Sequence, residues 1–462
     1  MNIQKNDILK LEIVDMNNLG AGVGKIDGAV VFVNGAVTGD IVEAKIIKVT
    51  KNYYVARVHR IVTPSPNRTL VPFCEAPESC GGCVYRHLTR ESELEMKRNH
   101  VEGLFKKAGL PEINILPVLE VSLRYGYRNK AQYPVAQTKD GVKAGFYASK
   151  THSVVSSAHC SLEPDVFGDI VTAVCDFATK YNISVYDEES GRGLLRHIYL
   201  RRGQISGEIM LCLVINGEKL PYADKFVPYI TSKFKGIVSL LLNVNKKNTN
   251  VVLGDKYINL YGRDYIEDIL CGLKFRISPE SFWQVNRDGA EKLYECAREL
   301  ASLTGNENVL DLYCGTGTIG LSMARSAKWV TGVEIVEGAV ECAKVNAKIN
   351  NIENADFYCA DASKTESIIP ADKEYDVVIL DPPRKGTTEE LISYIAKRNI
   401  ERVVYISCGP DTLARDVATF KKYGYVAGDV QPVDMFPVTG HIESVCLLSK
   451  LNTKQQNKHK KF

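Results

Sequence analysis

The chain has 462 residues, 45% of them hydrophobic, and a formal net charge of +3. This length suits about three domains at ~150 residues each, and the apolar content excludes a mostly disordered chain. The weak charge neither requires nor excludes a nucleic-acid partner, so local patches must decide. No signal-peptide core opens the sequence, and no apolar run approaches the ~18 residues of a membrane span. We therefore expect a cytoplasmic protein without a membrane partner, whose clustered cysteines bind metal or take part in catalysis.

Residues 1–62 are predicted to form a small OB-like β-barrel. Strand-like segments at 9–14, 30–33, 41–46 and 53–58 are separated by glycine-containing turns. The glycine-rich stretch 20–25 resembles a phosphate loop, but no helix follows it, so we expect a hairpin turn there. Barrels of this size with exposed Lys and Arg commonly bind oligonucleotides, and a purely structural barrel is the alternative.

Four cysteines are candidate metal ligands: Cys74, Cys80, Cys83 and Cys160. The first three lie within a short segment broken by glycine turns, so they can converge on one centre. Their C-x5-C-x2-C spacing lacks the two paired CxxC units of a zinc ribbon. Ligation by thiolates alone favours a [4Fe–4S] cluster, while the spacing leaves zinc open.

Residues 63–270 are expected to form a central α+β domain that carries this site. An amphipathic helix is predicted at 88–110. Residues 121–160 combine cations with aromatic side chains, namely Arg124, Arg128, Lys130, Lys139, Lys143 and Lys150 with Tyr125, Tyr127, Tyr133, Phe146, Tyr147 and His152. Such a surface suits phosphates and unpaired bases, with a solvated sheet face as the alternative. A second basic cluster comprises Arg192, Arg196, Arg201 and Arg202.

Residues 271–450 alternate between strand-like and helix-like patterns, which predicts a doubly wound, Rossmann-like α/β domain. Strands are expected at 309–313, 329–334, 355–359, 377–380 and 403–407, with a last strand at 445–448. Helices are expected at 321–327, 337–350 and 389–397, and another starts near 411. The polar, basic tail at 451–462 is expected to be disordered.

Cys408 directly follows the apolar, β-branched segment that stops at Gly409-Pro410. Ligands of open α/β sheets bind at the carboxyl ends of the strands, so a thiol there is placed for chemistry. The dipole of the following helix can lower its pKa. A small buried hydrophobic residue is the alternative interpretation.

A nucleoside-binding site is predicted at the same sheet edge. A Gly-rich loop follows Asp311, and Glu334 ends the next strand, where an acid can accept hydrogen bonds from ribose hydroxyls. Asp381-Pro382-Pro383 places a carboxylate after a later strand, and Asp361 can reach an adenine amine. The glycine loop alone leaves NAD and S-adenosylmethionine open; the two later loops favour S-adenosylmethionine.

With these motifs assembled, the chain resembles the RNA uracil-5-methyltransferases. It is most similar to the 23S ribosomal RNA members that carry an N-terminal TRAM domain and an iron–sulfur cluster. The segments that carry the resemblance are 282–286 (FWQVN), 311–317 (DLYCGTG), 381–386 (DPPRKG), 407–416 (SCGPDTLARD) and 441–444 (HIES). The family usually has Asn where this chain has Gly409, which puts an orienting role for that amide in doubt.

The resemblance implies a function and a set of site residues. The chain would transfer the methyl group of S-adenosylmethionine to C5 of a uridine in 23S rRNA, through a covalent bond from cysteine to C6. Cys408 would be the nucleophile and Glu443, placed in a loop before the last strand, the base. The cofactor would be held by Gln284, Tyr313, Glu334 and Asp381, with Asp361 as a further candidate. No obligate protein partner is expected.

Two other functions fit parts of the sequence. The same chemistry on transfer RNA is one, although such relatives generally lack the barrel and the cysteine cluster, so residues 1–83 favour ribosomal RNA. A non-catalytic RNA-binding or redox iron–sulfur protein is the other, and it leaves Cys408 and Glu443 without a role. An unpaired or flipped target uridine is expected, because the cofactor must reach C5.

Overall fold

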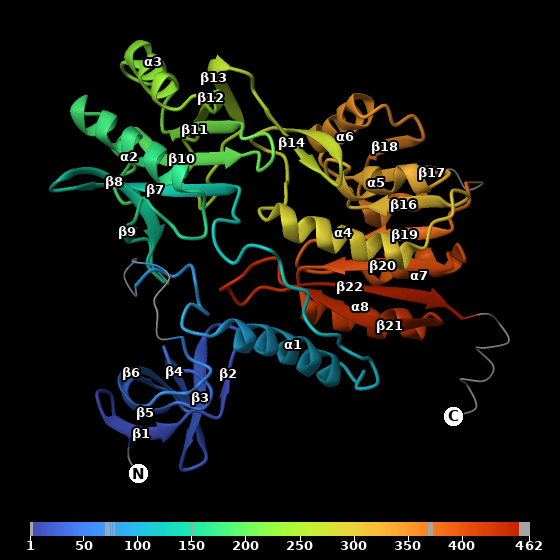
Figure 1. Cartoon of the computed structure of the whole chain (residues 1–462), viewed down its shortest axis with the longest axis horizontal. Coiled ribbons are helices and arrows are strands. Elements are labelled where there is room, and N and C mark those ends of the chain that lie inside the picture. Colours follow the sequence, from blue (N-terminus) through green and yellow to red (C-terminus); the bar gives the residue numbers. More distant parts are fainter. Residues whose placement is uncertain are drawn as a thin grey trace.

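The computed structural model describes residues 3–69, 74, 76, 79–149, 151–367 and 373–451. The predicted tail at 452–462 and the basic residue Lys150 lie outside these ranges. Figure 1 shows three lobes: a small N-terminal sheet, a central domain above it, and a C-terminal domain beside both. None of the described helices is long and apolar enough to span a lipid bilayer.

The N-terminal lobe is a six-stranded, barrel-like sheet in the order β1-β5-β6-β4-β3-β2. Its strands are β1 (Ile8–Glu12), β2 (Asp15–Met16), β3 (Ala21–Ile26), β4 (Ala29–Asn34), β5 (Ile41–Val49) and β6 (Tyr53–Thr63). The expected turn at 20–25 is wrong, because most of this segment forms β3. A Cβ at Gly24 would lie 2.3 Å from Leu11 Cδ1, so glycine here allows close packing against the core rather than a turn.

The central domain is a seven-stranded sheet in the order β13-β12-β11-β10-β7-β8-β9, with two helices packed on it. Its strands are β7 (Lys130–Thr138), β8 (Gly141–Tyr147), β9 (Val154–Ser156), β10 (Leu195–Arg202), β11 (Ile209–Ile215), β12 (Ile237–Val244) and β13 (Lys256–Gly262). The helices are α2 (Asp165–Lys180) and α3 (Ala223–Lys233). This architecture agrees with the predicted α+β domain.

Several residues of the predicted RNA surface belong to this core instead. Tyr127 and Tyr133 are 1% and 0% exposed, so neither can stack on an RNA base. Arg196 and Arg201 are also buried, and their guanidinium groups donate to backbone carbonyls such as those of Asn245 and Ser281. Aromatic and basic residues alternate in this sequence partly because β-strands place every second side chain inside.

Two elements connect the lobes. Helix α1 (Arg90–Lys107) follows the barrel and packs along the C-terminal domain, against α8 (Pro410–Lys422) (Figure 1). Its start is capped by Thr89, whose hydroxyl accepts the N–H of Ser92. The hairpin of β14 (Ile266–Leu270) and β15 (Leu273–Ile277) packs on α6 (Glu337–Ile349) and joins the C-terminal core.

The C-terminal domain is a seven-stranded sheet in the order β18-β17-β16-β19-β20-β22-β21. Its strands are β16 (Asn308–Leu312), β17 (Trp329–Glu334), β18 (Ala355–Cys359), β19 (Val377–Leu380), β20 (Arg402–Ser407), β21 (Tyr425–Val433) and β22 (Glu443–Lys450). The remaining helices are α4 (Arg287–Ala301), α5 (Thr318–Met323), α7 (Glu389–Lys397) and the short turns η1 (Ala324–Ser326) and η2 (Ala362–Ser367). Five strands are parallel, while β22 runs antiparallel between β20 and β21. The reversal at β22 brings a segment from late in the chain to the edge where the parallel strands end.

Candidate active site

The carboxyl ends of five adjacent parallel strands carry five of the predicted site residues. In sheet order these residues are Asp361, Glu334, Tyr313, Asp381 and Cys408. Because neighbouring parallel strands end at the same edge, residues separated by almost 100 positions meet there. The sequence therefore located this edge correctly.

Cys408 and Glu443 lie opposite each other on neighbouring strands. Ser407, the last residue of β20, pairs with Ser444 of β22 in an antiparallel register. Continuing that register by one residue sets Cys408 beside Glu443, at the ~4.5–5.5 Å that separates Cβ atoms of opposed residues. Glu443 is buried and is the first residue of β22, not part of a preceding loop as predicted. The pairing of β20 with β22 thus fixes the geometry of the two groups.

The electrostatics of this pair favour protonated groups. Burial, with Glu443 as the next contribution, raises the pKa of the Cys408 thiol to about 11. Burial and the nearby Asp381 raise the pKa of Glu443 well above its usual range, and burial raises the pKa of Asp381 to about 7. The sequence analysis expected that the dipole of the following helix could lower the thiol pKa, whereas burial and the carboxyl groups of Glu443 and Asp381 raise it here.

Arg384 is a functional candidate that the sequence reasoning left without a role. Its positive charge lowers the pKa of both Cys408 and Glu443, so it lies close to both groups. Its backbone carbonyl accepts a 3.2 Å hydrogen bond from the Thr412 hydroxyl, which ties the Asp-Pro-Pro-Arg segment to α8. The sequence contained one signal for this role: Arg384 is a cation three residues after Asp381, the carboxylate that follows strand β19.

Gly409, the departure from the family pattern, adjoins the same hydroxyl. A Cβ at Gly409 would lie 2.8 Å from Thr412 Oγ1 and 3.2 Å from the Arg384 carbonyl oxygen. The Gly409 carbonyl also accepts a 2.9 Å hydrogen bond from that hydroxyl. The space that a side chain at 409 would need is therefore occupied by Thr412, and the loop around Cys408 is held by backbone contacts.

The Gly-rich loop and Glu334 form the other end of the edge. Glu334 accepts the backbone N–H of Gly315 at 3.1 Å and that of Val336 at 2.9 Å. A Cβ at Gly315 would meet nothing within 4 Å, so the backbone there faces open space. Below the loop, Asp311 is fully buried and accepts the Gly320 N–H at 2.9 Å, and burial raises its pKa to about 8. The loop thus presents a half-exposed carboxylate and open backbone, which suits a nucleoside.

The remaining predicted cofactor residues have defined environments. Tyr313 has a left-handed φ of 66°, and burial raises the pKa of its phenol. Gln284 is buried, and its backbone carbonyl accepts the Asn129 side-chain amide at 2.9 Å, which fixes the FWQVN segment. Asp361 accepts both the N–H and the hydroxyl of Ser363, and these bonds lower its pKa. Its carboxylate is therefore ionised, and Ser363 already uses part of its capacity to accept hydrogen bonds.

The four cysteines of the predicted metal site line one cavity of about 120 Å³, together with Arg86, Arg128 and Glu163. All four are free thiols. Burial raises the pKa of Cys83 to about 12, while Arg128 and Arg86 lower it. Among the described residues, however, no three His, Cys, Asp or Glu side chains converge as they would on a single metal ion. The predicted ligands share a cavity but do not form a preorganised ion site.

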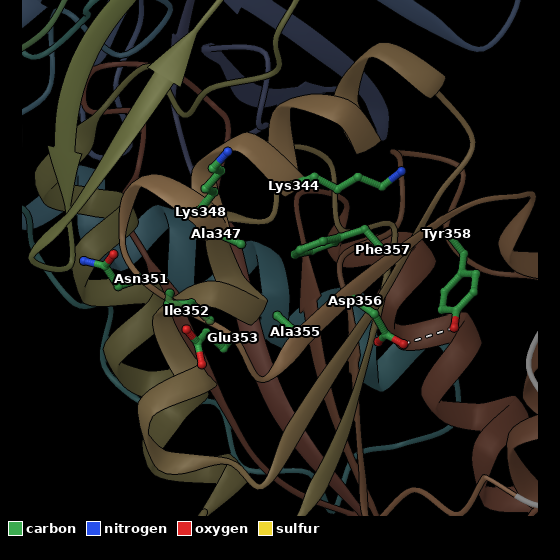
Figure 2. A pocket seen from close by; sticks show the side chains of 10 residues that line it. All are labelled: Lys344, Ala347, Lys348, Asn351, Ile352, Glu353, Ala355, Asp356, Phe357 and Tyr358. Carbon is green, nitrogen blue, oxygen red and sulfur yellow. Dashed lines mark hydrogen bonds between the residues drawn. The ribbon is translucent and has the colours of Figure 1, made fainter.

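Another surface pocket lies elsewhere. It measures about 550 Å³ and is formed by α6 and the edge strand β18. Figure 2 shows Lys344 and Lys348 above it and the hydrogen bond from the Tyr358 hydroxyl to Asp356. None of the predicted site residues lines this pocket.

Comparison with known proteins agrees with this geometry. Residues 255–451 match the family described as tRNA (uracil-5-)-methyltransferase, and residues 4–58 match the TRAM domain. An uncharacterized RNA methyltransferase of Clostridium acetobutylicum is 42% identical, over 97% of this chain and 98% of its own length. One from Halalkalibacterium halodurans is 40% identical, over 97% and 98%. The chain belongs to the S-adenosylmethionine-dependent RNA uracil-5-methyltransferases that carry a TRAM domain.

A solved structure is similar over nearly the whole chain. It is the Pyrococcus abyssi tRNA (uracil-54, C5)-methyltransferase in complex with S-adenosyl-L-homocysteine, with a TM-score of 0.77 and 28% identity. The match covers 95% of this chain and 99% of that one, so it necessarily includes most of the N-terminal barrel. The argument that a barrel disfavours a tRNA substrate is therefore wrong.

Proposed function

We propose that this chain methylates C5 of a uridine in RNA through a covalent Cys408–C6 intermediate. The observation that carries the proposal is the placement of Cys408 opposite Glu443, at the end of the strand next to Asp381. A nucleophile and a proton acceptor on the same side of one sheet edge can act on adjacent ring atoms. S-adenosylmethionine would supply the methyl group.

The residues have distinct tasks in this reaction. The Cys408 thiolate forms a bond to C6, and the electron pair of the C5–C6 double bond moves to give an enolate whose C5 is nucleophilic. C5 would then take the methyl carbon, whose bond to the sulfonium sulfur would break to leave S-adenosylhomocysteine. Glu443 removes the C5 proton, the double bond re-forms, and the sulfur–C6 bond breaks to restore the thiolate. A carboxylate with a raised pKa is a stronger proton acceptor once it is ionised, which suits Glu443 to this step.

The cofactor would lie along the edge from Glu334 to Asp381. Glu334 would accept hydrogen bonds from the ribose hydroxyls, next to the open backbone at Gly315. Tyr313 and Gln284 would contact the nucleoside and the methionine portion, and Asp361 the adenine amine. Asp381 follows β19, which lies between β16 and β20, the strand that ends before Cys408. Its carboxylate would therefore face the sulfonium charge of the cofactor.

For the substrate we propose a uridine of 23S rRNA. The support is the resemblance of the four-cysteine pattern to the ribosomal RNA members of the family; the barrel does not separate the two substrates. Transfer RNA is the second candidate, because the Pyrococcus abyssi enzyme that this chain resembles acts on tRNA. The two candidates share the chemistry and differ in the RNA that the barrel and central domain would hold.

A [4Fe–4S] cluster is our proposal for the four-cysteine cavity. A zinc ion, which would draw four sulfurs to ~2.3 Å from one point, is the alternative that the cysteine spacing leaves open. A cluster is wider, because each thiolate binds a different iron, and the shared cavity suits that arrangement. Arg86 and Arg128 line the cavity and would offset the negative charge of the thiolates.

One experiment tests the activity and the substrate together. RNA from a strain lacking the gene is incubated with purified protein and S-adenosylmethionine labelled in the methyl group, and 5-methyluridine is mapped by mass spectrometry. Label at one or two uridines of 23S rRNA supports the proposal, and label in tRNA alone selects the second candidate. Methylation of another base, or of no RNA, contradicts the proposed chemistry.

A further inference from the structure

The loop that links β21 to β22 ends one residue before Glu443, and it contains a strained residue. Val438 has a φ of +59°, a left-handed conformation that a β-branched residue rarely adopts. Such a conformation persists only where the surroundings impose it. The contacts of residues 434–442 should therefore show what holds this loop, and with it the start of β22.

Glu93 of α1 makes the central contact. It is fully buried, and its carboxylate accepts the backbone N–H of Val438 at 2.5 Å. The same carboxylate binds the Lys97 ammonium at 2.9 Å and the Arg124 guanidinium at 3.1 Å. Arg90 lies 3.4 Å from it as well. A buried acid held by three cations is itself fixed in place, so it can impose the conformation of Val438.

Lys97 holds the earlier part of the loop. Its ammonium is 2.5 Å from Asp434 Oδ1 and donates to the Phe436 carbonyl at 3.0 Å. It is 1% exposed, and Asp434 is also paired with Arg90. One helix of the N-terminal half thus binds the loop through three side chains, about 340 residues away in sequence.

Other elements complete the hold on Val438. Its carbonyl accepts the Tyr85 N–H at 3.0 Å, and its side chain packs with Tyr127 and Leu162. The Tyr127 hydroxyl donates to the Pro437 carbonyl at 3.1 Å. Both backbone groups of Val438 are therefore bonded, and the strand that begins with Glu443 starts from a fixed point.

We propose that Glu93 is a positioning residue for the base, acting through the left-handed turn at Val438. The proposal rests on the proposed function, because it requires Glu443 to remove the C5 proton. Without the Glu93 carboxylate the Val438 N–H loses its acceptor, the turn relaxes, and Glu443 moves relative to C5. Attack by Cys408 should be less affected, since Cys408 is also held by the pairing of β20 with β19 and by the contacts of its loop with α8.

The test compares Glu93→Ala with the double variant Glu93→Ala/Val438→Gly. In Glu93→Ala we expect kcat to fall on the order of 10²-fold, because a misplacement of ~1 Å costs about that much. The KM for S-adenosylmethionine and the covalent adduct with 5-fluorouridine RNA should be unchanged, and covalent enzyme should accumulate on natural RNA. Val438→Gly should restore much of kcat, since glycine adopts positive φ without strain.

Three further arms keep the outcomes distinct. Asp268→Ala removes another buried carboxylate, which accepts backbone N–H groups of Gln204 and Ile205, and should cost stability without trapping covalent enzyme. Glu93→Gln keeps an acceptor for Val438 and replaces the Ala variant if that variant does not fold; it should trap less adduct. Equal loss of adduct formation and turnover, or no rescue by glycine, overturns the inference. A wild-type enzyme that forms no fluorouridine adduct instead overturns the proposed function.

Discussion

The two cysteine sites of this protein are held in different ways. Cys408 follows a buried strand whose neighbours on both sides are paired in register, so its position is fixed by backbone hydrogen bonds. Cys80 is tied to the central domain through an isolated bridge to Ala148, and the other cysteines of that cavity lie outside the named helices and strands. The sheet thus preorganises the proposed nucleophile, whereas the cysteines of the cavity are held mainly by loops, which the proposed cluster would draw together.

Loss of the nucleophile should have the largest effect. In Cys408→Ala no bond to C6 can form, so C5 is not activated and methylation should fall below detection. Binding of S-adenosylmethionine and RNA should persist, because Cys408 holds neither. Gel shift under denaturing conditions with 5-fluorouridine RNA gives the critical measurement. If the Ala variant still forms that adduct, another cysteine is the nucleophile.

Glu443→Gln should stop the reaction at a later point. The thiolate still attacks and the methyl group still transfers, but the C5 proton stays, so covalent enzyme carrying methylated RNA should accumulate. Turnover should fall by about 10²–10⁴-fold, the usual contribution of a general base. Mass spectrometry of the trapped band measures whether the methyl group is present. Full turnover in this variant would assign the base to another residue.

Cys80→Ser tests the cluster proposed for the four-cysteine cavity. Protein purified without oxygen should contain about four irons and absorb in the visible range, and the variant should lose both features. Its thermal stability should fall, because metal ligation contributes to folding. Cys359→Ser, at an exposed position in the C-terminal domain, is the matched control and should keep its iron. Stoichiometric zinc in the wild-type protein would contradict the cluster.

The barrel should have a smaller and salt-dependent effect. Lys48 and Lys51 are exposed on it, and replacing both by Glu should weaken RNA binding several-fold at low salt and reduce the salt slope by about 2. The same change at Lys344 and Lys348, beside the pocket of Figure 2, is the control and should leave binding unchanged. Filter binding at several salt concentrations measures both. Equal slopes would mean that the barrel does not contact phosphates.

The smallest expected effect is a change in the pKa of the Cys408 thiol when Glu443 is replaced. Because the pKa of Cys408 lies at about 11, its alkylation by iodoacetamide should rise about tenfold per pH unit from pH 7 to 10. Removing the Glu443 charge removes a repulsive contribution, so Glu443→Gln should lower the thiol pKa and speed alkylation at a given pH. Peptide mass spectrometry resolves Cys408 from the other thiols. A slower rate in the variant would show that Glu443 does not lie beside the thiol.

Sequence reasoning succeeded where structure follows local patterns. The strands at 329–334, 355–359 and 377–380 were predicted with the observed bounds, because short apolar runs between helices become parallel strands. The position of Cys408 followed from the same rule. Family resemblance supplied Glu443, but its place on β22 depends on an antiparallel register that no local pattern encodes.

The failures share a physical cause, which is burial by distant segments. Tyr127 and Tyr133 carry polar groups and lie in a segment rich in basic residues, so the sequence suggested a stacking surface, yet both are buried in the fold. The bond between Glu93 and Val438 joins residues 345 positions apart. Such pairs become visible only when tertiary structure brings the segments together, and the shifted pKa values of the site depend on the same burial.

The raised thiol pKa also bears on how this enzyme meets oxidants. Peroxides attack thiolates, so a cysteine that stays protonated at neutral pH reacts slowly, while an exposed thiol such as Cys359 is open to the first encounter. Under oxidising conditions, oxidation would therefore mark the surface of the protein before it reached Cys408. Resistance to oxidative loss and low reactivity toward stray electrophiles follow from the same buried position of Cys408.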